Sequence, residues 1–119
     1  MRTATLVTQM LLRICFLALI VLGVLFWTGH ATGLVALHMS VGGIFVLLMW
    51  VMALLGFRAR AGADLVLMTL VGGFIVLALG MTQTRLMVGD AHWIVRVVHL
   101  LVGLAAIALT EQIGARIKK

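Results

Sequence analysis

Four long apolar runs constrain the fold of this chain more than any other feature of its sequence. They cover residues 10–28, 34–57, 65–84 and 91–110. Each run is about 20 residues long, the length at which an α-helix crosses a hydrocarbon core of about 30 Å. Hydrophobic residues make up 65% of the chain and charged residues only 10%, whereas soluble domains carry roughly a quarter charged residues. The sequence therefore excludes a water-soluble domain and predicts a surface that faces lipid.

These runs are expected to be helices rather than the strands of a β-barrel. They show no alternation of apolar and polar residues, and the chain contains no proline. The links at residues 29–33, 58–63 and 85–90 are short, and short links join antiparallel neighbours. The sequence predicts an all-α, integral membrane, antiparallel four-helix bundle with up-down-up-down topology, in which residues 1–119 form a single transmembrane domain.

The net charge of +6 does not indicate nucleic-acid binding, because the basic residues sort by side of the membrane rather than forming one patch. Arg85 and Arg96 fall on one side. The other side holds Arg2, Arg13, Arg58, Arg60, Arg116, Lys118 and Lys119. By the positive-inside rule, both termini lie in the cytoplasm, and we expect a multi-pass protein of the inner (plasma) membrane whose partner is the lipid bilayer. Glu111 is expected at the cytoplasmic interface without an intramembrane partner.

The second and fourth runs carry a related pattern. His38-Met-Ser-Val-Gly42 is echoed by His99-Leu-Leu-Val-Gly103, and each histidine stands four residues before a glycine. Chance is the alternative in a sequence of few residue types. However, histidine is scarce in this chain, with only four in all, so the repeat favours two related halves.

His38 and His99 are the candidate metal ligands. Ionisable side chains within a span are costly, usually face the bundle interior and mark functional sites. Both histidines are expected in the outer half, one or two turns below the surface. A neutral imidazole offers a nitrogen lone pair without adding charge, so two opposed rings at one depth suit a metal centre. His30 and His92 lie nearer the surface and are expected to be solvated.

Glycines on the other two runs suggest what kind of centre this is. Gly23 and Gly80 stand at nearly the depth of the histidines, and each leaves a gap where a side chain would stand. Gly42 and Gly103 add room one turn below each histidine on the same face. A flat porphyrin would use such gaps, whereas a bare zinc or copper ion would need two further ligands. The alternative is that these glycines only let helices pack closely.

On these residues the chain resembles the four-helix core of the membrane b-type cytochromes, in which diagonal helices supply paired histidines and the other two supply glycines. The resemblance implies that His38 and His99 are the axial ligands of haem b. That family commonly holds two haems, with ligands on one helix about four turns apart. Here His30 and His92 lie only eight and seven residues from the deeper pair. We therefore expect one haem, in the outer half.

Two arginines are candidate partners for haem propionates. Arg96 is three residues from His99 and thus on the same helical face, while Arg85 lies in the adjoining link. An ordinary loop charge is the alternative for Arg85, and snorkelling to the membrane surface is the alternative for Arg96.

The expected function is electron transfer by one haem b, because two histidine ligands leave no axial position for oxygen chemistry. The quinone pool and a redox partner protein are the candidate partners, and a homo-oligomer is compatible with the sequence. Any enzyme activity would be that of a quinone-linked oxidoreductase or of its electron-transfer subunit. The alternatives are a small transporter or channel for a metal cation or another small solute, and an accessory subunit of a larger membrane complex.

Overall fold

The computed structural model describes all 119 residues and confirms an all-helical chain folded as an up-and-down four-helix bundle. The long helices are α1 (Arg2–Trp27), α2 (Val35–Arg58), α3 (Ala63–Thr82) and α4 (His92–Lys118). Two single-turn 3-10 helices, η1 (Thr32–Leu34) and η2 (Gln83–Arg85), lie in the connections. All four long helices have the length and apolar composition needed to cross a bilayer, which is the pattern of a multi-pass membrane protein.

Two helices extend well beyond the apolar runs that predict them. The first helix begins at Arg2 rather than near residue 10, and the fourth continues to Lys118 rather than ending near residue 110. Hydropathy marks where the apolar composition changes, but a helix continues until its backbone is interrupted. In the first turns of α1, the hydroxyls of Thr5 and Thr8 donate to the carbonyls of Met1 and Ala4, so polar side chains are accommodated without breaking the helix.

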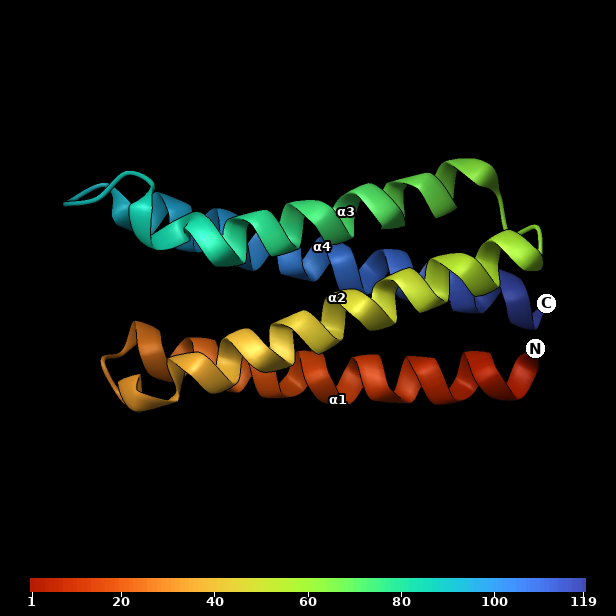
Figure 1. Cartoon of the computed structure of the whole chain (residues 1–119), viewed down its shortest axis with the longest axis horizontal. Coiled ribbons are helices and arrows are strands. Elements are labelled where there is room, and N and C mark those ends of the chain that lie inside the picture. The colour runs from red at the N-terminus through yellow and green to blue at the C-terminus, as the bar shows by residue number, and fades with distance from the viewer.

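In the four-helix bundle, only one of the two diagonal pairs of helices is in contact. Consecutive helices pack side by side, α1 also packs against α4, and α2 meets α4 across the bundle, whereas α1 and α3 do not meet. Figure 1 shows both termini and the α2–α3 connection at one end, which we call the terminal end. The α1–α2 and α3–α4 connections lie at the opposite end, which we call the histidine end.

The core of the bundle lies toward the terminal end. All four helices contribute to one apolar cluster, formed by Leu12, Phe45, Met49, Met52, Ala61, Leu65, Ala106 and Ile113. Glycines bring backbones close here: a Cβ on Gly56 would lie 2.8 Å from Cγ2 of Ile113, and a Cβ on Gly114 would overlap the amide of Gln9. The terminal end is therefore held by tight contacts among all four helices.

Packing is much looser toward the histidine end. Residues 15–44 and 74–104, which form this half, contain only Leu22 and Val95 of the 21 buried residues of the chain. In Figure 1 the α1–α2 hairpin and the α3–α4 hairpin diverge toward this end. Two helical hairpins thus share a compact base and separate in the half that carries His38 and His99.

Candidate functional site

His38 and His99 lie opposite each other inside the loosely packed half of the bundle. His38 is in the first turns of α2 and His99 is two turns into α4, and these are the two helices that meet across the bundle. The centroids of the two imidazole rings are 6.4 Å apart, and the ring planes are inclined by 52°. Both side chains are half-buried. The structure therefore brings the two sequence-predicted ligands into one site.

Each histidine faces a glycine of the helix that precedes it. A Cβ on Gly23 of α1 would lie 3.9 Å from Cε1 of His38, and a Cβ on Gly80 of α3 would lie 3.9 Å from Cε1 of His99. The two hairpins thus present the same local arrangement, related by the repeat. Because 3.9 Å is an ordinary contact distance, the imidazoles themselves leave room for an alanine at either glycine. The absence of both side chains therefore leaves bare backbone beside the pair.

The other two candidate glycines have different surroundings. A Cβ on Gly42 would contact Cδ2 of Leu19 at 3.8 Å, whereas nothing lies within 4 Å of a Cβ on Gly103. Gly103 therefore faces open space one turn from His99, and Gly42 packs against α1. Of these two positions, only Gly103 leaves unfilled room near the histidines.

The separation of the two rings allows one metal ion between them. The Nδ1 atoms of His38 and His99 are both buried without a hydrogen-bond partner, so nothing else in the chain engages these nitrogens. A metal–nitrogen bond of about 2.0–2.1 Å, with the nitrogen about 1.1 Å from its ring centroid, sets opposed imidazoles roughly 6 Å apart. The centroids of the two rings are separated by a similar distance, 6.4 Å.

The remaining ligands for such an ion would have to come from a group other than the protein. No cluster of three or more His, Cys, Asp or Glu side chains could hold a metal. A tetrahedral zinc site needs four ligands and so is not complete here. A porphyrin supplies four equatorial nitrogen ligands, so the protein needs to supply only the two axial ligands. The histidine pair and its bare glycines therefore fit haem better than a bare ion.

The two candidate arginines lie near the site but do not contact the histidines. Arg96 is exposed on α4, one turn from His99 toward the histidine end, and Arg85 is exposed in η2. Neither forms an ion pair, because the single salt bridge of the chain lies elsewhere. Both guanidinium groups are therefore free to pair with an anionic group at this end.

His30 and His92 are separate from the pair formed by His38 and His99. Nδ1 of His30 lies 3.0 Å from the hydroxyl of Thr28, and Nδ1 of His92 donates to the carbonyl of Leu86 at 3.1 Å. Each ring is thus held by its own connection rather than by the other histidines.

One aromatic residue at the site was not predicted from the sequence. The ring of Phe26 on α1 stands edge-on to His38, with ring centroids 5.4 Å apart and planes inclined by 66°. Phe26 follows Gly23 by three residues and so lies on the same face of α1. That spacing was available in the sequence, but only the packing of α1 against α2 shows which ring it meets.

A second missed feature is an ion pair in the terminal half. Arg13 binds Glu111 with two hydrogen bonds of 2.8 Å, and Nε2 of Gln9 donates to the same carboxylate at 3.1 Å. The expectation that Glu111 has no partner within the bundle is therefore wrong. The partner is separated by 98 residues, and nothing local indicates that α1 and α4 are neighbours.

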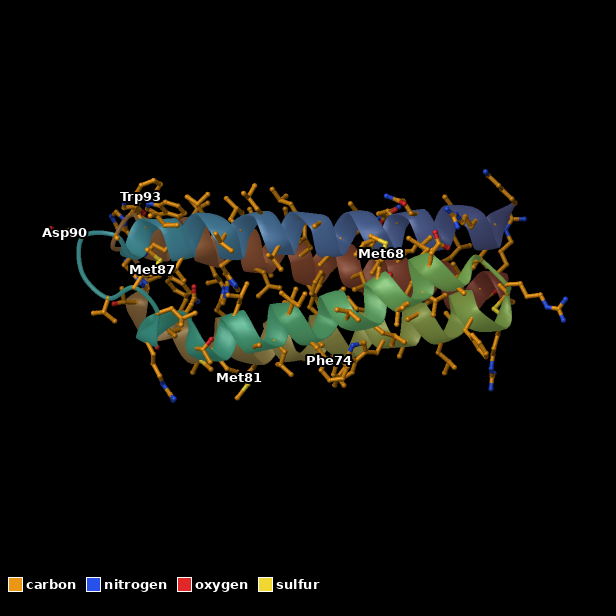
Figure 2. All side chains as sticks on the ribbon, turned by 90° about the horizontal axis from the view of Figure 1, so that it is seen from above. Met68, Phe74, Met81, Met87, Asp90 and Trp93 are labelled. Atoms are coloured by element: carbon orange, nitrogen blue, oxygen red, sulfur yellow. The ribbon has the colours of Figure 1, made fainter.

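A groove lies between α3 and α4, away from the two histidines. It has a volume of about 430 Å³ and is lined by residues 67–75 of α3 and 102–109 of α4. Figure 2 shows Met68 between these two helices, whereas Phe74 and Met81 point away from the bundle. Its lining contains no ionisable side chain, so it offers no group for catalysis or metal binding.

No family model, no curated protein and no solved structure matches this chain.

Proposed function

We propose that this chain is a membrane b-type cytochrome that binds one haem b between α2 and α4 and transfers electrons. The observation that carries the proposal is the pair of opposed imidazoles, 6.4 Å apart, each beside a glycine at the same distance. His38 and His99 would be the axial ligands. Haem supplies a one-electron redox couple, and two histidine ligands leave no axial position for oxygen.

The residues around the pair support haem rather than a smaller group. Gly23 and Gly80 leave bare backbone on α1 and α3, where the edges of a flat ring would pass. Gly103 leaves further open space one turn from His99, whereas Gly42 packs against Leu19 of α1 and adds none. Few side chains of this half are buried, so little of it is committed to packing within the chain.

Arginines at the histidine end would hold the charged edge of the cofactor. Arg96 is one turn from His99 and has no acidic partner in the chain, so its guanidinium can pair with a propionate. Arg85, in η2, is the second such candidate. With these two arginines as partners, the propionates would lie at the histidine end, where charge is less costly than in the hydrocarbon core.

The basic residues at the terminal end support an orientation with both termini in the cytoplasm of a cell with an inner (plasma) membrane. The haem would then lie toward the outer side. A quinone in the bilayer or a redox partner protein would exchange electrons with it, so the chain would act as a quinone-linked oxidoreductase or as its electron-transfer subunit.

An absorption spectrum of the protein purified from haem-replete cells tests the proposal. We expect one low-spin haem b per chain. His38→Ala and His99→Ala should give high-spin or haem-free protein, whereas the matched controls His30→Ala and His92→Ala should keep the low-spin spectrum. A colourless protein, or an unchanged spectrum in both ligand variants, would refute the proposal. A colourless protein that instead retains a metal ion through His38 and His99 would favour the transporter of a metal cation.

A further inference from the structure

The surroundings of His38 and His99 match on one side and differ on the other. Each Cε1 faces a glycine at the same distance. His38 also has the edge-on ring of Phe26 at 5.4 Å, whereas the only ring paired with His99 is His38 itself. The local symmetry of the two hairpins is therefore broken at one residue.

The sequence shows where this asymmetry arises. Phe26 stands three residues after Gly23, one helical turn closer to the histidine end on the same face of α1. The residue three positions after Gly80 is Gln83, which begins η2 rather than continuing α3. The α3 hairpin thus has neither an aromatic side chain nor an α-helical turn at the corresponding place.

Phe26 supplies an orienting contact that His38 otherwise lacks. The torsion that turns an imidazole about its Cβ–Cγ bond is broad and close to two-fold, so the ring needs a neighbour to fix its plane. Gly23 presents no side chain, and Nδ1 of His38 has no hydrogen-bond partner. An edge-to-face contact between aromatic rings at this separation favours one inclination over the others.

We propose that Phe26 is a positioning residue that fixes the ring plane of His38 and thereby keeps the two imidazoles inclined to each other. This inference rests on the proposed haem function. The angle between two axial imidazole planes sets the splitting of the iron d orbitals in a ferric low-spin haem, and the electron paramagnetic resonance (EPR) spectrum reports that splitting through its largest g value. Phe26 would influence the iron only through His38.

EPR of the oxidised, purified protein tests this role. Phe26→Leu keeps an apolar side chain of similar size but removes the ring, so we expect one low-spin haem per chain with a broadened and shifted largest g value. Phe26→Tyr keeps the ring and should restore the wild-type signal. Phe16→Ala is the matched control, because Phe16 is also on α1 but pairs with Phe45 rather than with a histidine, and it should leave the signal unchanged.

The possible outcomes distinguish the positioning role of Phe26 from the proposed haem binding. Wild-type protein without a low-spin haem would overturn both. A low-spin wild type with the same largest g value and line width in Phe26→Leu would overturn the positioning role alone. Loss of haem from Phe26→Leu would also overturn it, because Phe26 would then retain the cofactor rather than orient a ligand.

Discussion

The two ends of the bundle differ in how closely their helices pack. At the terminal end, side chains from four helices surround Phe45 and Met49, and glycines let neighbouring groups approach closely. At the histidine end, the same helices bury only Leu22 and Val95 and leave two imidazole nitrogens without partners. The terminal half therefore supplies most of the buried packing of the bundle, whereas the histidine half supplies little.

The polar residues of the two halves follow the same division. In the terminal half, Gln9 is 2% exposed, and both it and Arg13 bind Glu111. In the histidine half, His38 and His99 bind nothing within the chain. A polar group inside an apolar bundle is retained where it has a partner. Within the terminal cluster Nε2 of Gln9 has a partner, but Oε1 of Gln9 is buried without one, as Nδ1 is in each histidine.

The largest expected effect comes from overpacking the terminal half. Gly114→Leu would force a side chain into the space of the Gln9 amide, and overpacking of this kind costs about 1–3 kcal/mol. We expect a lower thermal unfolding temperature in detergent, measured by circular dichroism on haem-free protein. Gly103→Leu, on the same helix but with nothing within 4 Å of its Cβ, is the matched control and should unfold like wild type. Equal behaviour of the two variants would contradict the division into a tight and a loose half.

The second effect tests the histidine half through its cofactor. Gly23→Leu and Gly80→Leu should each expel the haem, because a branched side chain would fill the space beside a ligand ring. The helices should remain folded, since no atom lies closer than 3.9 Å to either Cβ. Haem content per chain and helical circular dichroism are the measurements. Normal haem content in both variants would mean that these glycines serve helix packing alone.

A smaller effect is expected from the ion pair. The Arg13 and Glu111 side chains are 52% and 35% exposed, so the large penalties of fully buried pairs do not apply. A double-mutant cycle with Arg13→Gln and Glu111→Gln should give a coupling of about 1 kcal/mol in unfolding free energy. Haem content should stay constant throughout the cycle. Additive effects would show that the pair does not join α1 to α4.

The smallest expected effect is a change in the haem reduction potential when Arg96 is replaced. Arg96→Ala should lower the haem reduction potential by roughly a few tens of millivolts, because removing a nearby positive charge disfavours the reduced iron. The low-spin spectrum should persist, since no iron ligand changes. Arg85→Ala, in the flanking η2, should give a smaller shift in the same redox titration. An unchanged potential in Arg96→Ala would place this arginine away from the cofactor.

Some features of the site were visible in the sequence because they are local or repeated. His38 and His99 are rare residues inside apolar runs, and each precedes a glycine by four positions. Gly23 and Gly80 could be matched to them by depth, since helical rise converts residue number into depth. Phe26 could not be assigned in this way, because its depth does not show which histidine its ring meets.

The sequence alone predicts an all-helical chain with four segments able to cross a membrane, because apolar composition over about 20 residues is a local property. Tertiary structure decided which helices form the close diagonal, how far apart the imidazoles stand, and that Arg13 pairs with Glu111. It also decided that packing is tight at the terminal end and open at the histidine end. These features depend on how side chains far apart in the chain fit together, and the order of residues along one helix does not specify that fit.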